Sequence, residues 1–248
     1  MNHGIALSED GKTLYASDSS NVYAWSYDES GPSVGKTSRT IIAGMDSNGH
    51  TSRTLLMSSK VPGTLVVSRG SSSNFDRKAQ DVSSGISQIK AFDLNTIGSN
   101  TYDYATQGML LGWGLRNSVG VAEEPLDGGI YSVENSADEI RRNGVDIHEN
   151  NPGEEMNFHG YLNGSTVDQG SNYGYPDCLS LFDAAIPELG SLTVGSQFSG
   201  NQNSSVDDEF CTTQRIPPRL TFPAHQAPLD IVFLSNGSKA FVSFHGSW

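Results

Sequence analysis

The fold is decided by residues 112–136, which read Gly-Trp-Gly-Leu-Arg-Asn-Ser-Val-Gly-Val-Ala-Glu-Glu-Pro-Leu-Asp-Gly-Gly-Ile-Tyr-Ser-Val-Glu-Asn-Ser. Two short apolar segments, 119–122 and 130–133, flank a turn at Asp127-Gly128-Gly129. Extended segments joined by a glycine-rich turn predict a β-hairpin.

Polar residues stand at both ends of this hairpin that lie opposite the turn. Arg116 and Asn117 precede the first strand, whereas Asn135 and Ser136 follow the second. An antiparallel hairpin brings these ends together. The sequence therefore predicts a site-like cluster at one end of a rigid element.

The same pattern occurs four times: a polar residue, a short apolar strand, a turn, and a second strand that ends near a serine. The predicted strand pairs are 5–7 with 14–17, 55–56 with 65–68, 119–122 with 130–133, and 229–233 with 240–243. Repeated hairpins predict an all-β propeller with one blade for each copy, and a β-sandwich is the alternative. Because the chain begins and ends within the pattern, we expect one partial domain over residues 1–248, an incomplete ring of about four blades. Missing blades at both ends, and a start at Met1 that is not the natural one, belong to this expectation.

Two other segments carry weaker predictions. Residues 180–189 predict one short helix, which Pro187 limits. Residues 190–218 are long, polar and without periodicity, which predicts an elaborate surface loop or partial disorder.

The charge balance excludes several partners. With 15 basic against 28 acidic residues, the net charge is −13. Phosphate binding needs a basic surface, so we expect no nucleic-acid partner. The chain also lacks an apolar run of the roughly 18 residues that a membrane span needs, so we expect no membrane partner.

Two cysteines and three glycosylation sequons favour a secreted, extracellular protein. Cys178 and Cys211 both lie in polar, glycine-containing segments, which favours a disulfide over two free thiols. The sequons begin at Asn163, Asn203 and Asn236. No signal peptide precedes them.

Two residues at equivalent positions of neighbouring repeats are candidates for chemistry. His50 comes just before a blade's first strand, and its ordinary pKa suits a general base. A structural histidine that caps a turn is an equal alternative. Arg116 offers a planar fork of donors suited to a carboxylate or a developing oxyanion. Its alternative role is a salt bridge to Glu123 or Glu124.

The adjacent carboxylates Glu154 and Glu155 could bind Ca²⁺ or act as acid and base. The favoured interpretation is that they lock a loop beneath the site. His148, His159 and His225 lack the spacing expected of a zinc site.

In this order, these motifs resemble the soluble quinoprotein glucose/sorbosone dehydrogenases, and in particular the fungal pyranose dehydrogenases that use pyrroloquinoline quinone (PQQ). The motifs are NHGIA at 2–6, GHTSR at 49–53, GLRNSVG at 114–120, SVENS at 132–136, NPGEEMNFHG at 151–160, NYGYPDC at 172–178, HQAPLD at 225–230 and HGSW at 245–248. The resemblance covers essentially the whole chain and implies a six-bladed β-propeller that binds PQQ and Ca²⁺.

The resemblance also implies a mechanism and its residues. His50 is expected to take the proton from a sugar's anomeric hydroxyl, and Arg116 to stabilise negative charge on the quinone. The sugar then becomes its lactone or acid, and electrons leave to an acceptor such as a cytochrome domain or protein. The implied cofactor-binding residues are Arg53, Arg69, Asn117, Asn135, His225 and His245. The implied Ca²⁺ ligands are backbone carbonyls near Ser136 and Ala137.

Some positions depart from the bacterial members of this family. Val119 stands where a glutamine touches their cofactor, and their substrate-site aspartate aligns near Arg69-Gly70. We therefore expect a rarer pyranose or a 2-keto-aldose sugar rather than glucose. The resemblance implies that the basic residues of later blades that hold PQQ fall beyond Trp248, so we expect this chain alone to bind PQQ weakly or not at all and to be inactive. A carbohydrate-binding propeller without turnover, and a Ca²⁺-dependent lactonase that uses Glu154 and Glu155, are the alternative functions.

Overall fold

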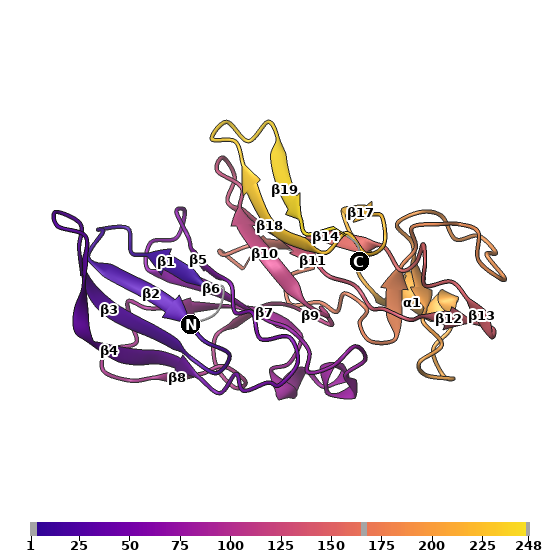
Figure 1. The fold of residues 1–248 in the computed structure, drawn as a ribbon, viewed down its shortest axis with the longest axis horizontal. Helices are drawn as coiled ribbons and strands as arrows, with labels where there is room; N and C mark the ends of the chain where they lie inside the picture. The colour runs from indigo at the N-terminus through magenta and orange to yellow at the C-terminus, as the bar shows by residue number, and fades with distance from the viewer. Residues whose placement is uncertain (1–3, 165–167, 247–248) are drawn as a thin grey trace.

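The computed structural model describes residues 4–164 and 168–246 as an arc of antiparallel sheets (Figure 1). The first sheet holds β1 (Ile5–Leu7), β2 (Thr13–Ser17), β3 (Val22–Asp28) and β4 (Ser33–Ala43), with β8 (Tyr102–Asp103) added in parallel. The second holds β5 (Leu55–Met57), β6 (Thr64–Arg69), β7 (Gln88–Asp93) and β9 (Met109–Trp113). The third holds β10 (Ser118–Glu123), β11 (Gly129–Glu134), β14 (Glu154–Tyr161) and β17 (Leu220–Phe222). A hairpin of β18 (Pro228–Phe233) and β19 (Ala240–Phe244) follows.

The four predicted strand pairs are confirmed. They are β1 with β2, β5 with β6, β10 with β11 and β18 with β19, all antiparallel. The first strand of each pair contributes to one groove, which is lined among others by Ile5, Leu56, Val121 and Ile231. The polar residues that precede these strands therefore lie toward one end of a shared channel, as in the propeller that the repeats predict.

Sheet-to-sheet packing explains the arc. Every residue of β6 is buried, and its side chains alternate between two neighbouring sheets. Leu65 and Val67 pack in a core with Val22 and Ile42 of the first sheet. Val66 packs instead with the third sheet, in a core that contains Ile130. A further core joins the third sheet to β18 and β19.

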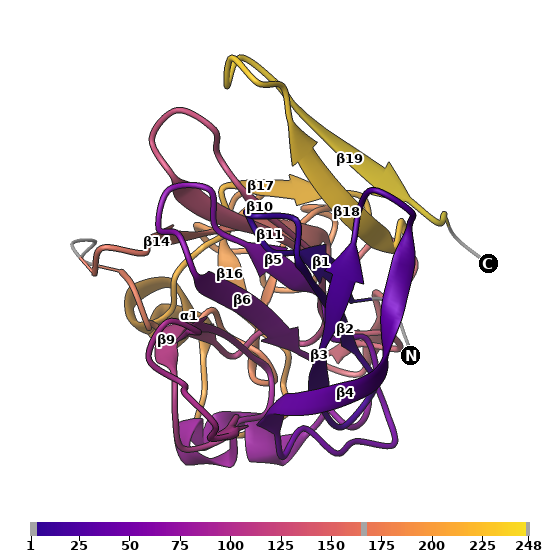
Figure 2. The same cartoon turned by 90° about the vertical axis from the view of Figure 1, so that its left-hand side faces the viewer.

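The arc is open, as expected. Within the described residues, no strand of the first sheet pairs with β18 or β19. Figure 2 shows that hairpin standing at the rim of the arc. One side of the hairpin packs through Ile231 in the core shared with the third sheet, whereas other large apolar side chains face solvent, with Val232 59% and Phe241 56% exposed.

The segment after β14 differs from its prediction. Residues 180–189 form no helix, because β15 (Cys178–Ser180) pairs with β16 (Gln197–Ser199) and Pro187 lies in the connection between them. The helix lies later: Asp207 caps α1 (Asp208–Gln214) by accepting a hydrogen bond from the Phe210 N–H. The segment 190–218 is ordered, because Leu192 and Phe198 belong to a buried core.

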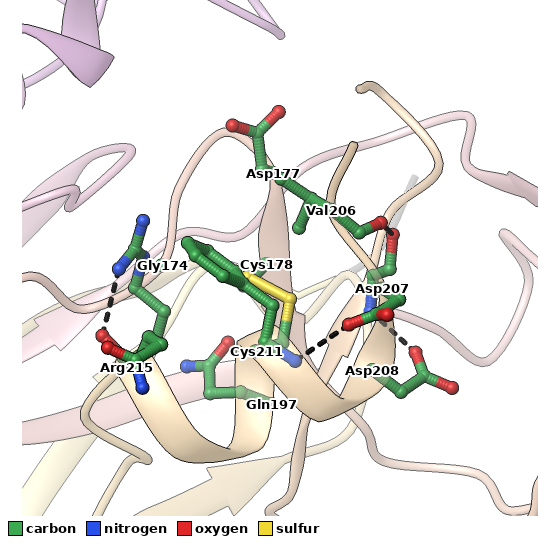
Figure 3. The surroundings of a disulfide bond; sticks show 12 residues. Gly174, Asp177, Cys178, Gln197, Val206, Asp207, Asp208, Cys211 and Arg215 are labelled. Carbon is green, nitrogen blue, oxygen red and sulfur yellow. Dashed lines mark hydrogen bonds between the residues drawn. A yellow bond between two sulfur atoms is a disulfide. The ribbon is translucent and has the colours of Figure 1, made fainter. Parts of the chain in front are cut away.

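The predicted disulfide is confirmed. Cys178 of β15 and Cys211 of α1 are bonded, with a Cα–Cα distance of 5.5 Å (Figure 3). Both residues are buried, so the bond fixes the helix against the small β15–β16 sheet.

The remaining elements are short. They are the 3-10 helices η1 (Arg77–Gln80) and η2 (Val82–Ser84), and the strand pair β12 (Arg141–Arg142) with β13 (Val145–Asp146). No helix in the described part of the chain is long and apolar enough to cross a membrane.

Candidate active site

His50 lies in the loop before β5, and its ring is held from one side. Nδ1 lies 2.9 Å from Ser71 Oγ and 3.1 Å from the Ser71 carbonyl oxygen. Burial, and next the Arg116 cation, lower the pKa of His50 to about 4. The ring is therefore neutral near pH 7, the state that a general base requires.

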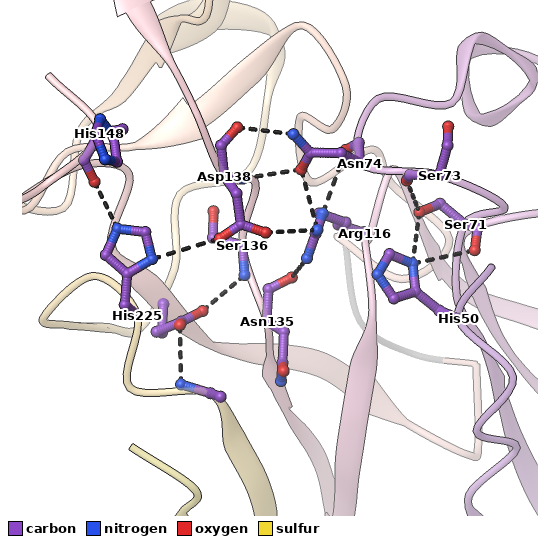
Figure 4. A network of polar contacts seen from close by, with 12 residues as sticks. His50, Ser71, Ser73, Asn74, Arg116, Asn135, Ser136, Asp138, His148 and His225 are labelled. Carbon is purple, nitrogen blue, oxygen red and sulfur yellow. Dashed lines mark hydrogen bonds and ion pairs between the residues drawn. The ribbon is translucent and has the colours of Figure 1, made fainter. Parts of the chain in front are cut away.

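Arg116 lies at the centre of the cluster (Figure 4). Its Nε donates to the Asn74 carbonyl and one Nη2 hydrogen to Asn74 Oδ1, at 3.2 and 3.0 Å. Nη1 donates to the Asn135 carbonyl at 3.3 Å, and Nη2 pairs with Asp138 at 3.1 Å. The side chain is almost completely buried, so its fork is fixed in orientation.

The alternative prediction of a salt bridge from Arg116 to Glu123 or Glu124 is wrong. Glu123 accepts hydrogen bonds from Ser58 and Ser59, whereas Glu124 accepts them from backbone N–H groups of its own turn. Both carboxylates lie at the turn end of the third sheet, away from Arg116.

Asn117 and His50 approach each other across Gly70. A Cβ added at Gly70 would lie 2.6 Å from Asn117 Oδ1 and 2.9 Å from His50 Cβ. Only the absence of a side chain at this position lets the two loops come this close. Asn135 belongs to the same cluster through its carbonyl, while its amide donates to the Pro228 carbonyl at 2.6 Å.

His225 joins the cluster from the loop before β18. Its Nε2 lies 2.6 Å from the His148 carbonyl oxygen, and Nδ1 lies 3.4 Å from Asp138 Oδ1. Asp138 therefore lies between His225 and Arg116, as Figure 4 shows. His245 is exposed: its ring contacts the Gly246 carbonyl, and its backbone N–H donates to the Ala227 carbonyl, so a cofactor contact stays a prediction.

The loop 136–137, the predicted Ca²⁺ position, is held from below by Glu154. This carboxylate accepts the Ser136 N–H at 2.7 Å and the Ala227 N–H at 3.0 Å. Within the described residues, no hydrogen bond reaches the carbonyl oxygens of Ser136 or Ala137. Glu154 thus locks this loop, which is the favoured interpretation of its sequence motif.

The two arginines predicted to bind a cofactor lie behind the cluster. Arg53 is fully buried and donates to the carbonyls of Met45, His50 and Ser52. Burial, and next Arg69, lower its pKa to about 10. The guanidinium thus holds the loop that carries His50, and a direct cofactor contact stays a prediction.

Arg69 is also buried, and it donates to the carbonyls of Asp46 and Gly85. Its guanidinium lies 5.9 Å from the centre of the Tyr104 ring. Here too a direct cofactor contact stays a prediction.

A second acidic group lies in the interior. Glu134 and Glu155 are cross-strand partners on β11 and β14, and both contact Asn157 Nδ2. Burial raises the pKa of Glu155 to about 7, and burial together with Glu155 raises that of Glu134. Glu134 also accepts the Arg116 N–H at 2.6 Å, which ties this pair to the loop above.

Three residues of the cluster were missed from the sequence: Ser71, Asn74 and Asp138. The first two belong to the polar run 71–74 that follows β6, at the same end of the blade as His50. Their position after a predicted strand, at the same end of the blade as His50, was the sequence signal that could have identified Ser71 and Asn74. Asp138 follows the predicted Ca²⁺ loop, and nothing in its local sequence indicated Arg116 as its partner.

Among the described residues, no group of three or more His, Cys, Asp or Glu side chains is placed to hold a metal ion. A hard cation at this site would therefore rely on backbone and amide oxygens as well as on carboxylates.

Comparison with known proteins gives consistent results. A family profile described as TrAA12-like matches residues 1–248. The chain is 52% identical to a pyrroloquinoline quinone-dependent sugar dehydrogenase of Hypocrea jecorina (strain QM6a), over 100% of its own length and 58% of the relative's. It is 34% identical to a pyrroloquinoline quinone-dependent pyranose dehydrogenase of Coprinopsis cinerea, over 100% of its length and 34% of that protein.

Solved structures agree with the fold. The calcium structure of the Trichoderma reesei carbohydrate-active enzyme of family AA12 superposes with a TM-score of 0.96 at 51% identity, over 100% of this chain and 62% of that one. The holo form of the Coprinopsis cinerea pyranose dehydrogenase PQQ domain superposes with a TM-score of 0.92 at 33% identity. The match covers 100% of this chain and 61% of that one. The chain thus spans about three-fifths of these structures, and the prediction of a partial propeller is confirmed.

Proposed function

Because the chain belongs to the TrAA12-like family, we propose that it forms part of a PQQ-dependent sugar dehydrogenase. The substrate is a pyranose or keto-aldose sugar, which is oxidised to its lactone or acid by hydride transfer to the quinone. The observation that carries the proposal is the placement of a neutral imidazole, His50, beside a fixed guanidinium, Arg116, at the channel end.

The residues present fit the two groups that this chemistry needs. PQQ is an anionic quinone, and the cluster offers it the Arg116 fork and the Asn117 amide. Within the described residues, four of the five Arg116 N–H groups have partners, so one N–H of Nη1 is left to meet a ligand. For Ca²⁺, the Ser136 and Ala137 carbonyls are suitable oxygen donors.

The chain's own residues then have distinct tasks. When bound, PQQ supplies a quinone that accepts hydride, and Ca²⁺ polarises it as a Lewis acid. His50 Nε2 takes the proton of the anomeric hydroxyl, because a neutral imidazole is a competent base. Arg116 faces the negative charge that develops, without reorganising, because Asn74, Asn135 and Asp138 already hold it.

A reconstitution experiment tests the proposal. The full-length protein that contains this chain, purified with PQQ and Ca²⁺, should reduce an artificial dye when a pyranose is added, and omission of PQQ should abolish the signal. Hydrolysis of a lactone without PQQ would instead support a lactonase, and sugar binding without turnover would support a carbohydrate-binding protein.

Substitution of His50 sharpens the test. His50→Ala should lower kcat by roughly 10²–10⁴-fold while PQQ binding persists, because only the base is lost. Normal turnover in this variant would remove His50 from the mechanism.

The setting of the enzyme is part of the proposal. A secreted, glycosylated protein is supported by the disulfide and by the exposed side chains of Asn163 and Asn236, although Ser165 of the first sequon lies outside the described residues. The electron acceptor is a cytochrome domain or a separate protein. A mass decrease on enzymatic deglycosylation of protein from a eukaryotic host would support the first point, and an unchanged mass would contradict it.

A further inference from the structure

Ser71 connects the two loops that carry the candidate catalytic residues. Its carbonyl accepts the His50 N–H at 3.0 Å, and its own N–H donates to the Arg116 carbonyl at 2.8 Å. Ser71 is fully buried. Its hydroxyl and carbonyl oxygens both lie within hydrogen-bond distance of His50 Nδ1.

The positions of the protons follow from these contacts. A serine hydroxyl has one hydrogen, and Ser71 Oγ donates it to the Ser73 carbonyl at 2.7 Å. The Ser71 carbonyl has no hydrogen to give. Both oxygens beside Nδ1 are therefore acceptors, so the imidazole must carry its hydrogen on Nδ1, which leaves the lone pair on Nε2.

We propose that Ser71 is a positioning residue that fixes His50 as the Nδ1–H tautomer and thereby presents Nε2 as the base. This inference rests on the proposed function, because it assigns the nitrogen that acts in that reaction. It also explains why a neutral polar run, rather than an acidic one, follows β6 at this point.

The charges around His50 are consistent with this role. The cations of Arg116 and Arg53 and the carboxylate of Asp138 face the ring, and its direct partner is an uncharged serine. The Ser71 carbonyl raises the pKa of His50, but by less than burial and Arg116 each lower it, whereas a carboxylate at the same place would favour the charged form more strongly. The base therefore stays neutral into mildly acidic solution.

Heteronuclear NMR of the imidazole nitrogens tests the tautomer directly, in protein without PQQ. The His50 signals are identified by their absence in His50→Ala. We expect a protonated, pyrrole-type Nδ1 in the unmodified protein. In Ser71→Ala, which loses the hydroxyl but keeps the carbonyl of residue 71 as an acceptor, we expect a larger share of the Nε2–H tautomer. A protonated Nε2 in the unmodified protein would overturn the proposal.

Kinetics of the reconstituted enzyme give the second readout. Ser71→Ala should lower kcat on the order of 10-fold, because one orienting hydrogen bond is lost, and Ser71→Thr should restore most of it. Ser71→Asp should move the acidic limb of the pH–kcat profile upward by about one unit or more. Ser72→Ala is the matched control, because among the described residues the Ser72 hydroxyl has one hydrogen-bond partner, the Ser47 hydroxyl at 3.4 Å.

The outcomes are separable. Unchanged kcat in Ser71→Ala, or an unmoved acidic limb in Ser71→Asp, would refute the positioning role. Absence of dye reduction in the unmodified full-length protein would refute the proposed function, while the NMR signals would separately decide the tautomer. If Ser71→Ala does not fold, the unmodified protein and Ser71→Thr still decide the question.

Discussion

Replacing Glu155 by glutamine should remove a pH dependence from the stability of the third sheet. Burial raises the pKa of this carboxyl from 4.5 to about 7. As the pH rises, the unfolded chain therefore loses this proton at a lower pH than the folded protein does. The contribution of Glu155 to the free energy of unfolding should be largest below pH 4.5, fall as the pH rises toward 7, and level off above it.

The magnitude follows from the size of the pKa change. Each pKa unit corresponds to about 1.4 kcal/mol, so the rise from 4.5 to about 7 amounts to roughly 3 kcal/mol. At acidic pH the variant should be less stable by about 1 kcal/mol, because an amide cannot accept hydrogen bonds at both of its ends. Glu155 accepts from Asn157 on one oxygen and from Gln197 on the other. The two stability curves should therefore cross between acidic and neutral pH.

Urea unfolding followed by tryptophan fluorescence, repeated across this pH range, measures the difference between the two proteins. Glu9→Gln is the matched control, because Glu9 is exposed and its substitution should leave no pH-dependent difference of this size. A difference between Glu155→Gln and the unmodified protein that stays constant with pH would show that Glu155 is ionised in the folded state. The assumed burial energetics would then be refuted.

Three further predictions concern the site and its support. Arg116→Lys should retain only part of the turnover and of the PQQ affinity, because an ammonium cannot reproduce the planar fork; dye reduction and PQQ titration measure both, and full activity would contradict the assigned role. Replacing Cys178 and Cys211 by serine should lower the free energy of unfolding by about 3–4 kcal/mol for the 33-residue separation, measured by urea unfolding, and unchanged stability would contradict a structural disulfide. Gly70→Ala should cost about 1–3 kcal/mol and displace Asn117, because its Cβ would lie only 2.6 Å from Asn117 Oδ1; unchanged stability and turnover would show that the two loops yield easily.

Local sequence was sufficient for the strand pairs. Apolar alternation and glycine-containing turns are properties of neighbouring residues, so the residue pattern alone was enough to locate all four hairpins. The disulfide followed because the chain has only two cysteines, Cys178 and Cys211. The helix could not be placed in the same way, because α1 is short and its position depends on the disulfide and on packing against β16.

The candidate site, too, was predicted only in part from the sequence. By itself the sequence determined which repeats carry polar residues before their first strands, and hence the choice of His50 and Arg116, whereas His225 was implied by the family resemblance. Only the tertiary structure decided their partners: Arg116 binds Asp138, 22 residues further along, and Asn74, 42 residues earlier. The strands are encoded by patterns of adjacent residues. Which loops of different blades meet is set by how the sheets pack on one another, and no local sequence pattern specifies this packing.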